Sequence, residues 1–271
     1  MASASPTPDE DKIRYLDLSP EQADQVVQTL RTYVSEPRQA RIEDALSART
    51  RDVAVVLEDI HSEHNASAVL RTAEAFGLLE VHTVPRNVEF KLSRKVSLGT
   101  HKWLDLRRHG DAGSAYADLK ARGYQIWAAD VHDNPVALNQ IPTDSKVALV
   151  FGNEHEGLSA DAVAAADGVF KVPMTGFVES LNISVAAAVS LHDVLERRRA
   201  AGQLAGLDPV ELRRIRAAWY AQSVRAAGPL LARAGLPRPF MSLGPVRYYT
   251  RRPDGGDTTV VAIEDDVDAA T

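Results

Sequence analysis

The 271-residue sequence contains no cysteine. Without thiols the chain cannot form a disulfide, a thiolate zinc site or a cysteine nucleophile. It also has no apolar run of about 18 residues, so we expect no membrane span. The opening stretch "MASASPTPDEDK" is polar and acidic, unlike a secretory signal. These absences favour a cytoplasmic protein without a membrane partner.

Phosphate-binding glycine motifs are missing as well. No GxGxxG follows the first expected strand and no GxxxxGK[ST] occurs, so an ordinary dinucleotide or P-loop site is disfavoured. The histidines are scattered, and no HExxH spacing is present. Glu154, His155 and Glu156 are neighbours on an expected turn and cannot easily converge on one ion. We therefore expect no metal.

The net charge of −6 at first argues against a nucleic-acid partner. Its distribution changes that conclusion, because residues 1–11 and 257–271 contain acids but no Lys or Arg. Without those eight acids, the rest of the chain has 31 basic and 29 acidic residues, a net charge of +2. A mildly positive body can bind RNA where its arginines cluster.

Strand and helix patterns alternate between residues 52 and 201. This alternation predicts an α/β domain with a mostly parallel sheet covered by helices on both faces. Near-continuous apolar runs fit strands that are buried on both sides. The runs lie at 53–60, 81–84, 124–131, 146–152 and 169–173, and the helical patterns at 66–76, 113–122, 160–166 and 183–201.

The flanking segments have other patterns. Residues 1–18 are rich in Ser, Pro and acids and are expected to be disordered. A helical extension over 19–51 begins with a capping-box pattern. We expect a further helix within 202–227. The last segment, 228–271, combines an expected hairpin around Pro-Asp-Gly-Gly with an acidic tail.

The segment "EDIHSEHNASAVLRTAEAFG" places Asn65 and Arg71 after the first expected strand. Asn65 could simply cap the helix, and Arg71 could be a solvated helical residue. However, helical side chains lean toward the N-terminus, and open α/β sheets bind ligands at the carboxyl ends of their strands. Because arginine matches phosphate oxygens bidentately, the pair could grip a nucleotide backbone.

Two later segments also place polar residues after strands. In "LVFGNEHEGLS", Gly152 permits a tight turn or a close approach of backbone to a ligand, and Glu154 could hold the loop by bonding backbone amides. In "VPMTGFVESLNISVAAAV", either Ser180 or Asn182 caps the following helix. The start of that helix is suited to an anion, and its small residues Ala186–Ala188 permit close packing of another segment or subunit.

Together, these three segments resemble, in order, the signature motifs of the SpoU/TrmH family of RNA 2′-O-ribose methyltransferases, within the SPOUT superfamily. The resemblance covers about residues 38–225. Its flanks, including "THKW" at 100–103, are most similar to the branch that methylates the D-loop guanosine (position 18) of tRNA. It implies a SPOUT-type fold with a deep trefoil knot at about 146–190, S-adenosylmethionine as methyl donor, and a homodimer.

The resemblance also implies the site residues. Arg71 would act near the ribose 2′-hydroxyl, stabilising the developing alkoxide or using a substrate phosphate as a proton relay, because arginine is a poor base. The other residues fall into three groups. Those implied for catalysis besides Arg71 are Asn65, Glu154, Ser180 and Asn182; those for the cofactor are Ala129, Gly152, Val172, Met174 and Leu181; those for RNA are Arg41, Arg49, Arg51, Lys102 and Arg198.

Some departures leave alternatives open. Glu196 stands where the D-loop branch favours a basic residue, and His155 where it favours Lys. The same chemistry on ribosomal RNA or at another tRNA position is therefore the nearest alternative. A knotted RNA-binding protein without catalysis and an ordinary nucleotide-cofactor enzyme are more distant ones. The motif "RYYTRR" near the C-terminus could bind RNA by stacking or simply form part of the hairpin.

Overall fold

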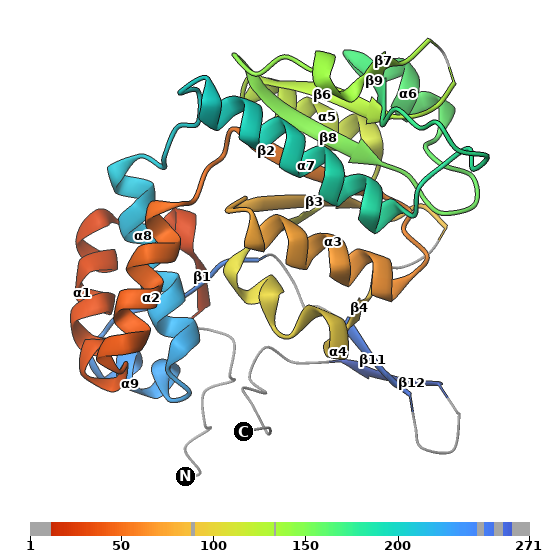
Figure 1. Ribbon diagram of the computed structural model, residues 1–271. Coiled ribbons are helices and arrows are strands. Elements are labelled where there is room, and N and C mark those ends of the chain that lie inside the picture. Colours follow the sequence, from red (N-terminus) through yellow and green to blue (C-terminus); the bar gives the residue numbers. More distant parts are fainter. Residues whose placement is uncertain (1–11, 88–89, 133, 243–246, 252–256, 262–271) are drawn as a thin grey trace. The chain divides into compact units, whose positions relative to one another are not determined.

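The computed structural model describes residues 12–87, 90–132, 134–242, 247–251 and 257–261 (Figure 1). These residues form two compact units. A helical unit comprises the described residues up to Ala48 and those from Leu207 to 242. An α/β unit comprises Arg49–Gly206 together with 247–251 and 257–261.

Within the described part of the α/β unit, seven strands pair in the order β5-β3-β2-β8-β6-β9-β7. Every neighbouring pair is parallel, which confirms the expected parallel sheet. All carboxyl ends therefore lie at one edge. The strands are β2 (Val53–Glu58), β3 (Glu80–Val84), β5 (Asp105–Arg108), β6 (Tyr124–Ala129), β7 (Val136–Ala137), β8 (Lys146–Phe151) and β9 (Gly168–Lys171).

Helices cover both faces of this sheet (Figure 1). α3 (Glu63–Ala75) and α7 (Ile183–Ala200) pack on one face, and α5 (Ala112–Ala121) and α6 (Ala160–Ala165) on the other. Alternate residues of β2 enter the two resulting cores, as expected for a strand buried on both sides.

A second, smaller sheet contains the C-terminal hairpin. β11 (Arg247–Arg251) and β12 (Asp257–Val261) pair antiparallel, which confirms the two strands of the expected hairpin. Its turn, at 252–256, lies outside the described residues, as does the acidic tail at 262–271. β11 also pairs in parallel with β4 (Leu92–Ser93). Short elements complete the unit: α4 (Arg94–Ser97), η3 (Thr100–Trp103) and η4 (Leu138–Gln140).

The helical unit contains α1 (Pro20–Leu30), α2 (Glu36–Ser47), α8 (Pro209–Ser223) and α9 (Ala227–Arg233), with η2 (Arg31–Tyr33) after α1. The expected capping box is present, since the Gln22 amide donates to Ser19 Oγ at 3.1 Å and the Ser19 amide to Gln22 Oε1 at 2.9 Å. The helix expected from about Asp208 to Ala227 begins at Pro209, with Asp208 as its N-cap, and ends at Ser223.

One expectation for the N-terminus needs correction. The sequence predicts disorder through residue 18, but β1 (Lys12–Arg14) and η1 (Tyr15–Asp17) are ordered, and β1 pairs with β10 (Arg238–Phe240). The physical reason is apolar anchoring, because Tyr15 and Leu18 are fully buried.

Candidate functional site

The first motif begins at the carboxyl end of β2, where α3 starts two residues before Asn65. Ser62, not Asn65, is the N-cap, and the Asn65 amide donates to Ser62 Oγ at 3.3 Å. The capping explanation for Asn65 is therefore wrong. Because the cap is supplied by Ser62, the Asn65 side chain can reach other loops.

Asn65 joins three segments that are far apart in the sequence. Its Nδ2 donates to Glu154 Oε1 at 2.6 Å, while its Oδ1 accepts from Asn182 Nδ2 at 3.2 Å. Glu154 follows β8 and Asn182 precedes α7. A continuous hydrogen-bonded chain thus runs from Glu154 through Asn65 to Asn182, at the carboxyl edge where open α/β sheets bind ligands.

Glu154 is held in its charged form by this chain. Burial raises the pKa of Glu154, but hydrogen bonds from Asn65 and from backbone amides, including that of His61 at 3.4 Å, outweigh it. The net result is a pKa below the ordinary value. Glu154 is therefore a fixed acceptor at neutral pH, which agrees with a positioning role rather than with a proton-donating one.

The loop that carries Glu154 is built around Gly152 and Asn153. A Cβ on Gly152 would lie 2.1–2.3 Å from backbone atoms of Gly157 and Leu158, so only glycine fits. Asn153 Oδ1 accepts from the amides of His155 at 2.9 Å and Glu156 at 2.7 Å. Among the described residues, the buried Nδ2 of Asn153 has no hydrogen-bond partner. Such a donor is expected to meet a ligand or water.

The polar insert before α7 contains the cap of that helix. Asn182 Oδ1 accepts from the Ser184 amide at 2.9 Å, so Asn182 both caps α7 and bonds Asn65. Ser180 is exposed and forms no hydrogen bond with the described residues. Arg71 is likewise exposed on α3, and its guanidinium forms no hydrogen bond or ion pair within the described part of the chain. Both side chains are therefore available to a ligand.

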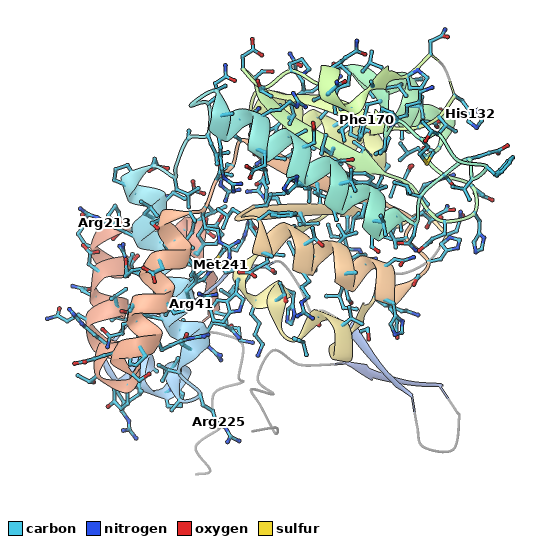
Figure 2. All side chains as sticks on the ribbon, in the orientation of Figure 1. Arg41, His132, Phe170, Arg213, Arg225 and Met241 are labelled. Atoms are coloured by element: carbon cyan, nitrogen blue, oxygen red, sulfur yellow. The ribbon has the colours of Figure 1, made fainter. Side chains whose placement is uncertain are left out.

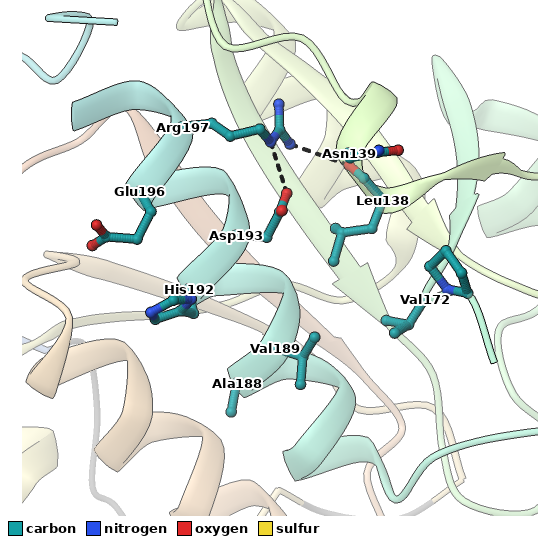
Figure 3. A pocket seen from close by; sticks show the side chains of 10 residues that line it. Leu138, Asn139, Val172, Ala188, Val189, His192, Asp193, Glu196 and Arg197 are labelled. Atoms are coloured by element: carbon teal, nitrogen blue, oxygen red, sulfur yellow. Dashed lines mark hydrogen bonds and ion pairs between the residues drawn. The ribbon is translucent and has the colours of Figure 1, made fainter. Parts of the chain in front are cut away.

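The residues expected to contact a cofactor lie on neighbouring segments. Ala129 ends β6, Gly152 follows β8, Val172 and Met174 follow β9, and Leu181 precedes α7. A groove of about 660 Å³ opens beside Val172. In Figure 3, Val189 of α7 lines this groove on the side facing Val172.

Two acidic residues at the end of β2 were missed by the sequence reasoning. Glu58 accepts from the Ser159 amide at 2.9 Å and from Ser159 Oγ at 2.7 Å, which ties β2 to the start of α6. Asp59 has a φ of +53° and accepts from the amides of Arg86 and Asn87. The signal was an acidic pair, both nearly fully buried, ending an apolar strand in "VAVVLED".

Three of the arginines expected to bind RNA have their guanidinium groups bonded to other residues of the protein. Arg49 and Arg198 are each 2% exposed and donate to carbonyl oxygens, Arg49 to Glu74 and Leu78, and Arg198 to Ser145 and Gln203. Arg51 pairs with Glu80 and Asp105. We correct the expectation for these three, because their guanidinium groups hold the fold.

The other two residues expected to contact RNA, Arg41 and Lys102, differ in their exposure to solvent. Arg41 is exposed on α2 (Figure 2) and forms no ion pair with the described residues. Lys102 is half-buried in η3, which leads into the start of β5. Their role stays a prediction.

A group that could hold a metal lies on the face of the sheet that α5 covers. Ligand atoms of His82, His109 and Asp118 lie within 4.8 Å of one another. However, Arg122 bonds Asp118 at 2.7 Å, and Arg107 lies 3.5 Å from the same oxygen. Two guanidinium groups so close to the ligands oppose a divalent cation. We interpret the cluster as part of an ion-pair network.

A parallel sheet with polar groups from three loops at its carboxyl edge defines a ligand-binding α/β domain. The profile of the SpoU rRNA Methylase family matches residues 52–192, and the chain belongs to this family. The match confirms the resemblance seen in the three motifs.

Curated relatives agree with this assignment. The tRNA (guanosine(18)-2′-O)-methyltransferase of Thermus thermophilus is 40% identical over 187 residues, 68% of this chain and 96% of the relative. The enzyme of the same name from Escherichia coli (strain K12) is 37% identical over 165 residues, 61% of this chain and 72% of the relative. Among solved structures, the A. aeolicus TrmH/SpoU tRNA modifying enzyme is similar with a TM-score of 0.65 and 29% identity, over 70% of this chain and 98% of that one.

Proposed function

We propose that this protein transfers a methyl group from S-adenosylmethionine to the ribose 2′-hydroxyl of the D-loop guanosine, position 18, of tRNA. The observation that carries the proposal is the Glu154–Asn65–Asn182 chain, which joins the three family motifs at one sheet edge. The names of the relatives supply the substrate.

The cofactor fits the loops that would receive it. Gly152 permits close approach of backbone to a ligand, and the unpartnered Nδ2 of Asn153 offers a buried donor. Val172, Met174 and Leu181 would add apolar and backbone contacts from the segments next to this loop. The bound donor supplies a methyl group already activated by its sulfonium sulfur.

The protein's residues would align the ribose and manage its proton. In the reaction, the 2′-oxygen forms a bond to the methyl carbon, and the carbon–sulfur bond breaks with its electron pair going to sulfur. The proton of the 2′-hydroxyl passes by way of a substrate phosphate oxygen to water. Alignment is the larger contribution, and the Asn65 chain would provide it. Arg71, with no partner among the described residues, would stabilise charge developing on the oxygen. Ser180 would contact the substrate or cofactor from the α7 loop.

The trefoil knot at about 146–190 belongs to the same proposal. β9 pairs with β6, whereas α7 packs against α3, with Phe76 and His192 ring centroids 5.9 Å apart. Residues 172–182 must therefore cross β6 and β8 to connect β9 with α7. We infer that this crossing segment is threaded through the preceding loops, as the family resemblance implies.

We also propose a homodimer formed through the outer face of α7. Val185 and Val189 are 46% and 40% exposed on this helix, and Phe177 and Val178 are exposed in the loop before it. Exposed apolar side chains grouped in this way are typical of an interface. Light scattering should report a dimer, and Val189→Asp should shift it toward the monomer.

The remaining expectations complete this proposal. The SPOUT domain at 52–201 would carry the methyl transfer. The flanking segments at 19–51 and 202–227 would bind RNA, with Arg41 as a contact. Lys102 of the SPOUT domain would be a further contact, and 228–271 would be a C-terminal extension. The protein would act in the cytoplasm, where tRNA is found.

Mapping of ribose methylation on a tRNA transcript tests the function. With S-adenosylmethionine, purified protein should methylate the guanosine at position 18 and no other ribose. Methylation only of ribosomal RNA or of another tRNA position would replace the substrate, and no methylation of any RNA would refute the enzyme.

Calorimetry tests the cofactor loop. Gly152→Ala should weaken S-adenosylmethionine binding more than about 10-fold, because overpacking here would displace backbone. Gly206→Ala is the control, since a Cβ at Gly206 meets nothing within 4 Å. Equal affinity in the two variants would contradict the assignment of this loop.

A further inference from the structure

Asp59 is held in an unusual backbone conformation at the carboxyl end of β2. Its φ is +53°, in the left-handed region where Asp and Asn are the most tolerated residues other than glycine. The side chain is almost fully buried, at 1% exposure. A strained, buried acid next to a substrate edge points to a positioning role.

The Asp59 carboxylate fixes the turn that follows β3. Oδ1 accepts from the amides of Arg86 at 3.0 Å and Asn87 at 2.7 Å, and Oδ2 accepts from Asn87 Nδ2 at 2.9 Å. The Asp59 amide also donates to the Val84 carbonyl at 2.8 Å. Four hydrogen bonds therefore lock residues 84–87 against the end of β2.

This turn presents a cation, Arg86, that is only weakly paired within the described residues. The Arg86 side chain is 37% exposed, and its one ion pair within the described residues is a 4.0 Å contact with Glu58. The Glu58 carboxylate already accepts two hydrogen bonds from Ser159. The Arg86 guanidinium thus keeps most of its donors for another partner.

The same acid connects the turn to the candidate site. His61 Nε2 lies 3.4 Å from Asp59 Oδ2, and the His61 amide donates to Glu154 Oε2 at 3.4 Å. Glu154 in turn accepts from Asn65. Arg86 is therefore anchored through Asp59 and His61 to the chain that would align the ribose.

We propose that Arg86 contacts a phosphate of the RNA substrate beside the target ribose, and that Asp59 is the positioning residue that holds Arg86 there. This inference rests on the proposed function. Arginine suits the contact, because its planar fork binds two phosphate oxygens at once. Contacts of this kind fix the register of a nucleic acid and carry no base specificity.

Steady-state kinetics with a tRNA transcript test the contact. Arg86→Ala should raise the KM for tRNA about 5- to 10-fold and leave kcat within about two-fold, because a phosphate contact made equally in ground and transition states affects binding alone. The slope of log KM against log salt should fall by about one. The Kd for S-adenosylmethionine, measured by calorimetry, should not change.

Lys120→Ala is the matched control. It removes one positive charge from the last turn of α5, which leads into the amino end of β6, and Lys120 is exposed beside Asp167. The KM and the salt slope of this variant should equal those of the wild type. If Arg86→Ala behaves like Lys120→Ala, the proposed contact does not exist.

A double-mutant cycle tests the role of Asp59. Asn tolerates the left-handed backbone, so Asp59→Asn removes the carboxylate without a backbone penalty, and Asp59→Gly removes the side chain while relaxing φ. Each should raise the KM for tRNA in the wild-type background and add less than about two-fold in the Arg86→Ala background. Equal effects in both backgrounds would show that Asp59 does not act through Arg86.

The outcomes separate this inference from the proposed function. A wild-type protein that methylates tRNA, combined with an unaltered KM in Arg86→Ala, overturns only the phosphate contact. A wild-type protein that methylates no RNA overturns the function, and the inference with it.

Discussion

The two edges of the parallel sheet treat charge in opposite ways. At the carboxyl edge, Asn65 and Glu154 are paired with each other, while Arg71 and Ser180 have no hydrogen-bond partner in the described part of the chain. At the amino edge, charged groups pair with one another. In the same sheet, polar groups at the carboxyl edge are therefore available to a ligand, and charged groups at the amino edge stabilise the fold.

Glu80 is the centre of the amino-edge network. It is fully buried and receives Arg51, Arg122 at 2.8 Å and the Tyr124 hydroxyl at 2.8 Å. Burial raises the pKa of Glu80, but the hydrogen bond from His82 and the charges of Arg51 and Arg122 hold it well below the ordinary value. Asp105 pairs with Arg51 and Arg107 beside it.

The comparison teaches that a structural cluster differs from a binding site in whether its charged groups already have hydrogen-bond and ion-pair partners within the protein, and not in charge alone. A buried carboxylate ringed by cations contributes nothing to a ligand, because its lone pairs are used. An exposed guanidinium without a partner is ready to meet an anion. Four changes should break or sharpen this contrast.

Glu80→Gln should have the largest effect, and on stability. It removes the buried counter-charge that Arg51 and Arg122 share and leaves only Asp105 and Asp118 to pair with them, so we expect a loss of about 3–5 kcal/mol in the free energy of unfolding by urea. Methyl transfer per folded molecule should be unchanged. Glu43→Gln, which breaks an exposed pair with Arg216, should cost about 1 kcal/mol or less. Similar losses in both variants would contradict a structural amino edge.

Arg71→Ala should have the largest effect on catalysis. Without charge stabilisation at the ribose oxygen, the rate of methyl transfer in single turnovers should fall about 10²- to 10³-fold. The melting temperature and the Kd for S-adenosylmethionine should stay as in the wild type. A wild-type rate in Arg71→Ala, with RNA binding unchanged, would show that the guanidinium has no electrostatic role.

His101→Gln should alter the response of stability to acid. Burial, aided by the charge of Lys102, lowers the pKa of His101 to about 4. The unfolded chain takes up a proton below about pH 6.5 and the folded one only near pH 4, so stability falls as pH drops through this window, by about 3 kcal/mol in total. The variant should lose that part of the slope in urea titrations at pH 7, 5.5 and 4. An unchanged slope would mean that His101 titrates normally.

Arg41→Ala should have the smallest effect. One exposed phosphate contact on the helical unit is worth a few-fold in RNA affinity, with a decrease of about one in the salt slope. Filter binding at several salt concentrations measures both. An unaltered slope would remove Arg41 from the RNA surface.

The sequence predicted the sheet and the three motif loops because their signals are local. Apolar runs reveal buried strands, and Gly152 and Asn182 stand at strand and helix ends where backbone geometry selects them. The family resemblance added the roles of residues that have no local signature, such as Arg71.

What the sequence could not provide depends on distant partners. Arg51 and Arg71 are both arginines near element ends, yet Arg51 meets Glu80, which is 29 residues away, and Arg71 meets no such carboxylate among the described residues. From the sequence Asn65 could be a helix cap, but in the structure Ser62 is the N-cap. The Asn65 side-chain amide instead donates a hydrogen bond to Glu154, which is 89 residues away. Which side chains become partners over such sequence distances is decided by the tertiary fold.

The path from β9 back to α7 also bears on the order of folding. Asn182 can bond Asn65 only after the sheet from β2 to β9 has formed and the following segment has crossed two strands, a contact that spans 117 residues. Long-range closures of this kind are slow. During refolding the sheet should therefore form well before the complete site does. When the denatured protein is diluted into buffer, activity should recover later than β-structure.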